Sequence, residues 1–229
     1  MIQIKAVGDC GVLVVLGDSI NESVHSKVME LNRKINALSP MGMMETVPAF
    51  CSVLVFYDSL KTDFDTVAKL LFQMSEDLED KTGTKGKLVE IPVCYGGSFG
   101  PDLSFVAGYG NLTEEEVIRV HSGRDYLIYM LGFLPGFPYL GGMDERIVTP
   151  RLKTPRIRIP AGSVGIGGEQ TGIYPIDSPG GWQLIGRTPY CLFKPEQAKR
   201  PVYEAGDSIR FVPITQEEFE EIIKKQERV

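Results

Sequence analysis

Four arginines fall within one stretch of this acidic chain, and their chemistry is that of anion binding. Arg151, Arg156 and Arg158 are close neighbours, and Arg187 follows in a Gly-Arg-Thr-Pro run, while the net charge of the 229 residues is −6. A guanidinium group holds a carboxylate or a phosphate through two parallel hydrogen bonds. Arg156 and Arg187 have the more constrained neighbours and are predicted to be catalytic. For Arg151 and Arg158, solvated charges at a strand edge are an alternative.

Polar groups on aromatic or rigid supports occupy the same stretch, and we expect them to bind a substrate. Residues 130–189 contain 12 of the 25 glycines and 8 of the 15 prolines, so the backbone there must adopt defined turns. These turns are predicted to present a set of substrate-binding side chains around a pocket: Tyr139, Gln170, Tyr174, Trp182 and Gln183. Alternatively, the turns are barrel corners, the glutamines satisfy backbone groups, and Trp182, the one tryptophan, anchors a core.

His121 is the third predicted catalytic residue and one of two histidines. It falls where a helix is expected to end, so it could act as a general acid or base or merely favour the helix dipole. His25 lies on a separate predicted helix, and no spacing of His and Cys indicates a metal site. The chain also lacks a phosphate-binding loop, a dinucleotide-binding glycine pattern and a Gly-x-Ser-x-Gly elbow. It therefore has no self-sufficient catalytic apparatus.

The elements that must position these residues begin with an α+β unit. Strand patterns over 2–7 and 11–16 flank a Gly-Asp turn, and a helix capped by Asn21 runs towards Pro40. Further elements are expected at three places: an extended piece over 45–48, a strand over 52–57 and a helix from Val67 to Leu78. The polar, glycine-punctuated segment 81–87 is the expected linker between two domains.

The second part of the chain begins with a strand pattern over 88–93 and contains two well-specified helix starts. Thr113 with Glu116, and a repeat of the pattern at Thr215, match the capping box. Between these helices the chain is β-like, and strands are expected over five short apolar runs: 126–131, 162–166, 182–185, 190–193 and 208–212. Short strands with dense turn chemistry indicate a closed barrel or a sandwich.

Composition excludes several classes of partner and location. A pI near 5.1 argues against nucleic acid, because binding the phosphate backbone needs a basic face. Neither a secretory signal nor an apolar run long enough to span a membrane is present in the sequence. The four cysteines are scattered among apolar residues, which is typical of buried, unpaired thiols in a reducing compartment. A cytoplasmic protein is expected.

A string of motifs in a fixed order resembles the allophanate hydrolase subunit 1 family. The motifs are Pro135-Gly-Phe-Pro-Tyr-Leu140, Pro155-Arg156, Pro160-Ala-Gly-Ser-Val164, Gln170-Thr-Gly-Ile-Tyr-Pro175 and Ser178-Pro-Gly-Gly-Trp-Gln-Leu-Ile-Gly-Arg-Thr-Pro189. The likeness extends to earlier parts of the chain through Gly8-Asp9, Val47-Pro48, and Tyr95-Gly-Gly97 with Asp102-Leu103. It implies an α+β fold, with an N-terminal ferredoxin-like α/β sandwich domain over 1–85 and a cyclophilin-like β-barrel domain over 86–229, which contains the motif region 130–189.

The resemblance also implies a function. The family includes the B subunit of an ATP-dependent 5-oxoprolinase, which cleaves 5-oxo-L-proline to L-glutamate together with A and C partner subunits. ATP would then be bound by a partner or at a shared interface, and the isolated chain would be inactive. The family also includes an inhibitor of a sporulation sensor histidine kinase, and its name points to urea or allophanate hydrolysis; both stay open as alternatives. Matching His121, Arg156, Gln170 and Arg187 to the family's binding positions is a hypothesis.

Overall fold

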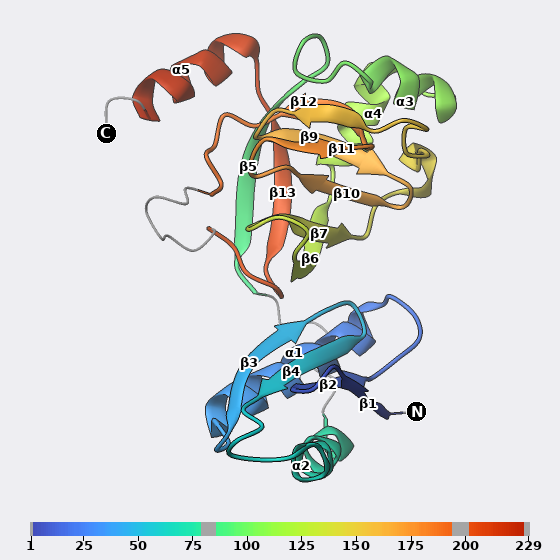
Figure 1. Ribbon diagram of the computed structural model, residues 1–229. Coiled ribbons are helices and arrows are strands. Elements are labelled where there is room, and N and C mark those ends of the chain that lie inside the picture. The colour runs from blue at the N-terminus through green and yellow to red at the C-terminus, as the bar shows by residue number, and fades with distance from the viewer. Residues whose placement is uncertain (1, 79–85, 194–201, 227–229) are drawn as a thin grey trace. The chain divides into compact units, whose positions relative to one another are not determined.

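The chain divides into two compact units, residues 1–84 and 85–229, which are coloured blue to teal and green to red in the computed structural model of Figure 1. The structure describes residues 2–78, 86–193 and 202–226. The expected linker over 81–87 lies, except for its last two residues, outside this part of the chain. Among the described residues, no helix has both the length and the apolar character needed to cross a membrane.

The N-terminal unit is a four-stranded antiparallel sheet with two helices. The strands lie in the order β1-β2-β4-β3. The connection from β2 through α1 therefore passes over one strand position before β3, and β4 lies between β2 and β3. Strand alternation and helical periodicity predicted these elements, and all six are found: β1 (Gln3–Val7), β2 (Gly11–Val15), α1 (Glu22–Leu38), β3 (Met43–Pro48), β4 (Ser52–Tyr57) and α2 (Phe64–Glu76).

Alternation and capping explain why this unit folds as it does. Val12 and Val14 of β2 and Val53 and Val55 of β4 are fully buried, because every second side chain of a strand faces the helices. The Asn21 side chain accepts a hydrogen bond of 2.9 Å from the Val24 amide and starts α1, as predicted.

The second unit is built around a closed barrel of seven strands in the order β10-β7-β6-β13-β5-β12-β9. Strand β13 runs parallel to β5, and the other neighbours are antiparallel. The barrel strands are β5 (Leu88–Tyr95), β6 (Asp125–Leu131), β7 (Pro138–Gly141), β9 (Ser163–Gly167), β10 (Gln170–Ile173), β12 (Gln183–Arg187) and β13 (Ser208–Pro213). The expected α+β class with a closed barrel is thus confirmed.

Helices and a separate β-ribbon surround the barrel. The helices are α3 (Leu103–Tyr109), α4 (Glu114–Ser122), η1 (Glu145–Ile147) and α5 (Gln216–Gln226), and the ribbon pairs β8 (Arg156–Ile159) with β11 (Ser178–Gly180). Both predicted capping boxes are confirmed. The Glu116 and Glu218 amides donate to the threonine hydroxyls over 3.2 Å, and each glutamate accepts from the threonine amide.

One expected strand is wrong, and several short ones escaped prediction. Residues 190–193 form no strand, because the Tyr190 amide turns back to the Thr188 hydroxyl over 3.2 Å. Cys191 in this segment is exposed, contrary to the expectation of buried thiols. Strands β7, β8, β10 and β11 have four residues or fewer and lie in glycine- and proline-rich sequence, where local pattern predicts turns.

A chain of polar groups crosses the barrel's core at His121. This residue in the last turn of α4 is fully buried, and its ring stacks on Phe211 with a centroid distance of 4.5 Å. Its Nδ1 and Nε2 atoms lie 2.8 Å from the Tyr95 hydroxyl and the Thr171 hydroxyl, respectively. The Thr171 hydroxyl in turn donates to the Gly165 carbonyl over 3.0 Å.

The direction of these bonds fixes the protonation of the ring. The Thr171 hydroxyl donates its one hydrogen to the Gly165 carbonyl, so it can only accept a hydrogen bond from His121 Nε2–H. Nδ1 then carries no hydrogen and accepts a hydrogen bond from the Tyr95 hydroxyl. Burial lowers the pKa of His121 to about 3, so the ring is neutral near neutral pH. The neutral Nε2–H tautomer therefore ties α4 to β5, β9 and β10.

We expect Thr171→Val to lower the free energy of unfolding of the barrel unit by roughly 1–3 kcal/mol, because it leaves His121 Nε2–H buried without its hydrogen-bond acceptor. Thr188→Val is the matched control: Thr188 is also buried, and its hydroxyl accepts a bond of 3.2 Å from the exposed Tyr190 segment and not from His121. Urea unfolding followed by the fluorescence of Trp182 reports this unit. Equal losses in the two variants would contradict the assigned network.

A second expectation concerns pH. The unfolded chain protonates His121 near its ordinary pKa of 6.5, whereas the folded chain does so only near pH 3. The stability that this group contributes is therefore complete above about pH 6.5 and is lost as pH falls towards 3, by up to about 1.4 kcal/mol per pH unit. His121→Asn should remove this slope between pH 7 and 5. Parallel stability profiles for variant and wild type would rule out the neutral buried ring.

Candidate functional site

Three of the predicted binding residues meet around a fourth aromatic ring that sequence reasoning missed. Phe137 contacts Tyr139, Tyr174 and Trp182 at centroid distances of 5.2, 5.3 and 5.5 Å, with the rings tilted or edge-on to one another. Together with Ile159 and Leu184 these rings form a core of their own, separate from the barrel interior. We call the four rings the aromatic cluster. Phe137 stands inside a predicted motif, but nothing local marks it as the centre.

Tight backbone turns place these rings. The Phe137 amide donates to Leu134 over 3.0 Å and the Gly132 amide donates to Phe137 over 3.1 Å, so a compact loop delivers Phe137 at the start of β7. The indole of Trp182 lies against Gly167 of β9. A Cβ at this position would lie 2.4 Å from the indole nitrogen, and only glycine leaves room for the ring.

Two of the four arginines singled out in the sequence reach the aromatic cluster. The guanidinium of Arg151 lies over the Trp182 ring, 5.7 Å from its centroid, in cation–π geometry. Arg156 donates from Nη1 to the Trp182 carbonyl over 3.1 Å. Burial raises the pKa of Tyr174 to about 12, although the Trp182 amide and these two arginines oppose the rise. Its phenol therefore stays neutral and able to donate a hydrogen bond.

Asp102 is the acidic partner that organises this region. Nη2 of Arg156 lies 2.7 and 2.8 Å from the two carboxylate oxygens of Asp102, and the Leu184 amide donates to the same carboxylate over 2.6 Å. Asp102 occupies the N-cap of α3 but makes no side-chain cap, because its carboxylate is turned towards Arg156. The Asp102 amide also donates to the Leu184 carbonyl over 2.9 Å. One residue thus joins α3, β8 and β12.

This joint requires a close approach of two backbones. A Cβ at Gly100 would lie 2.0 Å from the Ile185 carbonyl oxygen, so no larger residue fits between the start of α3 and β12. Asp102 belongs to the motifs that carry the family resemblance, but it was not among the predicted site residues. Its partners follow 54 and 82 residues later in the chain, and no local signal connects them.

The remaining predicted residues lie at other places in the barrel unit. Gln183 is buried and donates to the Pro150 carbonyl over 2.9 Å, which fixes the loop that carries Arg151. Gln170 opens β10, opposite Gly167. Arg187 ends β12, at the far end of the strand from Gln183, and donates from Nε to the Ala161 carbonyl over 2.9 Å.

His121 belongs to the barrel's core and not to the aromatic cluster. Its ring contacts Tyr95, Tyr126 and Phe211, and both ring nitrogens have protein partners. General acid–base chemistry would need a path from this buried ring to a substrate. The catalytic role of His121 stays a prediction, whereas its structural role follows from the contacts.

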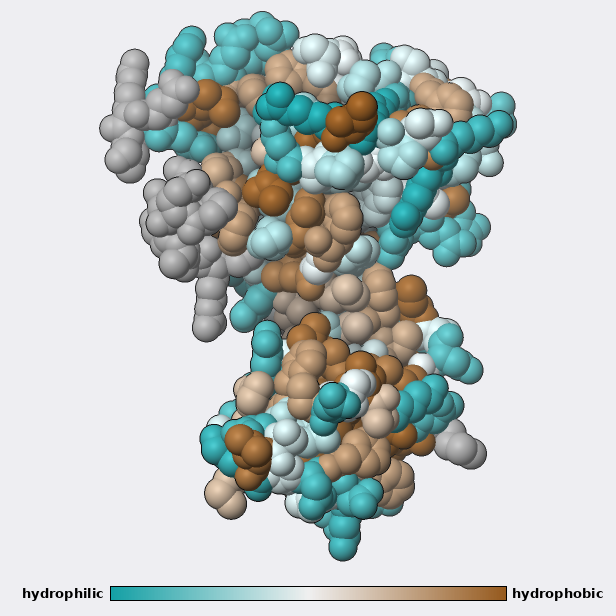
Figure 2. Space-filling model, in the orientation of Figure 1, coloured by the Kyte–Doolittle hydropathy of each residue, from teal (hydrophilic) through white to brown (hydrophobic). Residues whose placement is uncertain are grey.

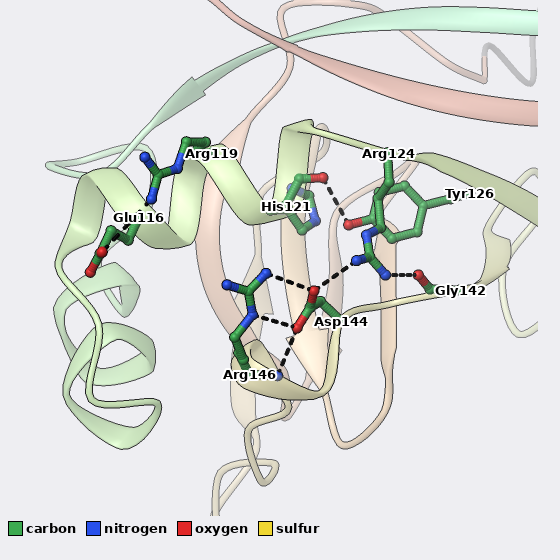
Figure 3. Close-up of polar contacts among 8 residues, drawn as sticks. All are labelled: Glu116, Arg119, His121, Arg124, Tyr126, Gly142, Asp144 and Arg146. Carbon is green, nitrogen blue, oxygen red and sulfur yellow. Dashed lines mark hydrogen bonds and ion pairs between the residues drawn. The ribbon is translucent and has the colours of Figure 1, made fainter.

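A cluster of ion pairs, formed by Asp144 with Arg124 and Arg146, lies near the end of α4. Figure 3 shows Asp144 between Arg124 and Arg146, at N–O distances of 2.7 and 2.9 Å. The hydrogen bonds from Arg146 hold the pKa of the Asp144 carboxyl far below its usual range. On the adjoining helix the backbone carbonyl of His121 accepts a hydrogen bond of 2.8 Å from the Tyr126 hydroxyl. These contacts hold α4 and η1 in place around the network of His121.

Within the residues that the structure describes, no group of three or more His, Cys, Asp or Glu side chains could hold a metal ion. The aromatic cluster and the arginines beside it can fix the orientation of a bound molecule. Guanidinium groups, a neutral phenol and an indole lie on short strands whose positions are fixed by backbone contacts. This arrangement can bind a small polar or anionic molecule, but the side chains described supply no activated nucleophile.

These features define a two-unit α+β protein whose barrel carries an arginine–aromatic region. The sequence matches the carboxyltransferase domain family, subdomains C and D, over residues 2–203, and the chain belongs to this family. It is 44% identical to the B subunit of 5-oxoprolinase from Bacillus subtilis, over 95% of each chain. The expected resemblance to the allophanate hydrolase subunit 1 family is thereby confirmed.

Solved structures show the same architecture. The uncharacterized protein PH0987 from Pyrococcus horikoshii is 49% identical, with a TM-score of 0.57, and the match covers 95% of this chain and 100% of that one. TTHA0988 is 32% identical with a TM-score of 0.79, and the match covers 93% of this chain but 41% of that one. The fold described here therefore also occurs as part of a longer chain.

The role assigned to Asp102 can be tested by Asp102→Asn, which removes the charge from the pair. We expect a loss of roughly 1.5–3 kcal/mol in the unfolding free energy of the barrel unit, because the pair is largely shielded, with 29% of the Arg156 side chain and 14% of the Asp102 side chain exposed. Asp177→Asn is the control, since its pair with Arg158 is far more exposed. A similar small effect of both changes would contradict the role given to Asp102.

Proposed function

We propose that this chain is the B subunit of an ATP-dependent 5-oxoprolinase, which cleaves 5-oxo-L-proline to L-glutamate together with A and C subunits. The observation that carries the proposal is the end-to-end likeness, at 44% identity, to a relative that is named as the B subunit of 5-oxoprolinase. The word subunit in that name implies a complex with other chains. The motif string of residues 130–189 falls within the matched length.

The chemistry of the substrate fits a shared site. A five-membered lactam is unstrained, and its amide opens readily once ATP has phosphorylated the carbonyl oxygen and created a leaving group. This chain has no phosphate-binding loop, so the proposal assigns nucleotide binding to a partner or to a shared interface. The isolated chain is then inactive, and its residues bind and orient the substrate.

Arg187 is the group that we assign to the substrate carboxylate. Its Nε donates to the Ala161 carbonyl over 2.9 Å, which orients the guanidinium. The proposal assigns its two terminal nitrogens to a carboxylate, since no hydrogen bond joins them to the residues that the structure describes. Arg156 is assigned a positioning part, because Asp102 and the Trp182 carbonyl already take its donors. Tyr139, Gln170, Tyr174, Trp182 and Gln183 are assigned to substrate binding, and His121 retains its predicted catalytic assignment.

The finer fold assignments belong to the same proposal. A four-stranded antiparallel sheet in the order β1-β2-β4-β3 with two helices supports a ferredoxin-like N-terminal domain, and a closed barrel flanked by helices supports a cyclophilin-like second domain. A barrel of this kind does not carry prolyl isomerase activity by itself, because function depends on the site and not on the fold.

Reconstitution decides the function. We expect the wild-type chain, mixed with purified A and C subunits, ATP and 5-oxo-L-proline, to release glutamate at a rate that falls to background when this chain is omitted. Arg187→Ala should lower kcat/KM at least about tenfold, since a charge-assisted bond to the carboxylate contributes about 1.5–3 kcal/mol. Arg187→Lys should recover part of the loss, and Arg119→Ala, whose side chain is 76% exposed, is the control.

Glutamate release that continues without this chain would refute the proposed function. Loss of complex formation in Arg187→Ala, measured by gel filtration with the A and C subunits, would instead assign the arginine to assembly. Inhibition of the autophosphorylation of a sporulation sensor kinase by the purified chain, without glutamate release from the reconstituted mixture, would favour the alternative role.

A further inference from the structure

The segment 160–163 between β8 and β9 is a type II β-turn. The Ser163 amide closes it by donating to the Pro160 carbonyl over 3.2 Å. Gly162 occupies the third position with a φ of 82°, the left-handed value that this turn type requires there. A Cβ on Gly162 would also lie 2.5 Å from the Thr188 carbonyl oxygen, so only glycine fits. The turn type fixes the direction in which its central peptide points.

This central peptide is held at both ends. Its carbonyl, which belongs to Ala161, accepts the 2.9 Å hydrogen bond from Arg187 Nε. Its amide, which belongs to Gly162, donates to the Tyr174 carbonyl over 2.7 Å. Among the described residues, the Arg187 side chain makes no further hydrogen bond. The guanidinium therefore takes its orientation from the Ala161 carbonyl.

The side chain of Asp177 also holds this turn. Its Oδ1 accepts a 2.8 Å hydrogen bond from the Ala161 amide, while its Oδ2 accepts one of 2.8 Å from Arg158 Nε. The bond from the Ala161 amide, and after it the charges of Arg158 and Arg187, hold the pKa of the Asp177 carboxyl below its usual range. One carboxylate thus joins an ion pair on β8 to the turn that orients Arg187.

Charge at the surface does not by itself distinguish Asp177. Hydrophilic side chains cover much of the barrel unit on the face that Figure 2 shows, and 45% of the Asp177 side chain is exposed. An ion pair as exposed as that of Asp177 with Arg158 stabilises a fold only slightly. The bond to the Ala161 amide has a different consequence, because Ala161 also carries the carbonyl that orients Arg187. Asp177 therefore affects where the guanidinium points more than whether the chain folds.

The strand neighbours of Arg187 offer it no charged partner. Arg187 is the Cα partner of Cys94 on β5 and of Ser163 on β9, and paired residues project to the same face of a sheet. Both neighbours are buried, and burial raises the pKa of the Cys94 thiol, which stays neutral. No ion pair joins Arg187 to a residue in the described part of the chain. A carboxylate ligand therefore meets a guanidinium that no direct salt bridge neutralises.

We propose that Asp177 is a positioning residue for the substrate carboxylate: through the Ala161 peptide it holds Arg187 in the orientation in which both terminal nitrogens can bind that carboxylate. The identity of the ligand rests on the proposed function, whereas the coupling of Asp177 to Arg187 does not. A guanidinium that is already oriented loses less conformational entropy when the ligand binds. Asp177 thereby acts on the affinity for substrate and leaves the chemical step unchanged.

NMR of the arginine Nε–H groups tests the coupling on the isolated chain. A guanidinium Nε–H that is bonded to a carbonyl is protected from exchange with water, and Arg187→Lys assigns its signal by removing it. We expect Asp177→Ala to speed this exchange, because the Ala161 amide loses its acceptor. Asp177→Asn should keep the signal, since the asparagine carbonyl oxygen can replace Oδ1. Thermal unfolding close to that of the wild type should show that the variants are folded.

Asp125→Ala is the matched control for the loss of an exposed carboxylate. Asp125 also forms an ion pair in the barrel unit, with Arg210 over 2.7 Å, and 33% of its side chain is exposed. It lies on β6, which pairs with neither β9 nor β12. This change should leave the Arg187 signal as it is in the wild type.

The reconstituted mixture of A and C subunits with this chain tests the consequence for the substrate. We expect Asp177→Ala to raise the KM for 5-oxo-L-proline roughly two- to tenfold at unchanged kcat, the range expected when one long side chain must be ordered on binding. Charge alone would have the opposite effect, because removing a carboxylate near Arg187 favours an anion. Asp177→Asn should therefore restore the KM to the wild-type value or below it. Adding Asp177→Ala to Arg187→Ala should lower kcat/KM no further, since both act through one guanidinium.

Three results would each overturn the inference: an unchanged Arg187 signal in Asp177→Ala, equal rises in KM in Asp177→Ala and Asp125→Ala, or a fall in kcat at unchanged KM. Glutamate release that does not depend on this chain, together with the expected change in the Arg187 signal, would refute the proposed function. The coupling of Asp177 to Arg187 would then stand without the assignment of its ligand.

Discussion

The carboxylate of Asp102 is the constraint on which the arginine–aromatic region of the barrel unit depends. It accepts hydrogen bonds from Arg156 of β8 and from the Leu184 amide of β12, while its own backbone starts α3. A helix, a barrel strand and a surface ribbon therefore share one anchor. Arg156 in turn reaches the carbonyl of Trp182, so the aromatic cluster takes its position from the same joint. The close approach at Gly100 follows from it, because two backbones must meet where the carboxylate bridges them.

The barrel interior uses a second polar joint of a different kind. The ring of His121 is neutral, and its two nitrogens act as one donor and one acceptor in a line of hydrogen bonds from Tyr95 to the Gly165 carbonyl. The joint at Asp102 is an ion pair at the partly exposed edge of the fold. The joint at His121 is a neutral hydrogen-bonded ring in the buried core. Both connect segments distant in sequence, and neither includes Arg187, whose Nε donates to the Ala161 carbonyl over 2.9 Å.

Local signals predicted much of this fold, and long-range pairing explains what they missed. Asn21, Thr113 and Thr215 act within three residues of their partners, so sequence alone identified the helix starts. The gathering of Tyr139, Tyr174 and Trp182 was also foreseen, since rigid turns carry all three. The places of Phe137 and Asp102 in the site were not predicted, because most of their partners lie far along the chain. His121, Arg156 and Arg187 were grouped as catalytic residues because of their side-chain chemistry. Where each lies in the barrel unit depends on the register of the strands, which residue type alone does not predict.

The place of β13 in the barrel imposes an order on folding. This strand, close to the end of the described chain, lies between β5 and β6, and the Asp207 carboxylate before it accepts from the Lys87 amide 120 residues earlier. During synthesis the N-terminal unit can fold early, since its strands pair within 57 residues of the start. The barrel cannot close until β13 has been synthesised, and pairing strands so far apart in the sequence is slow. Over that interval the edges of β5 and β6 are exposed, which makes the nascent barrel the aggregation-prone stage in the life of this protein.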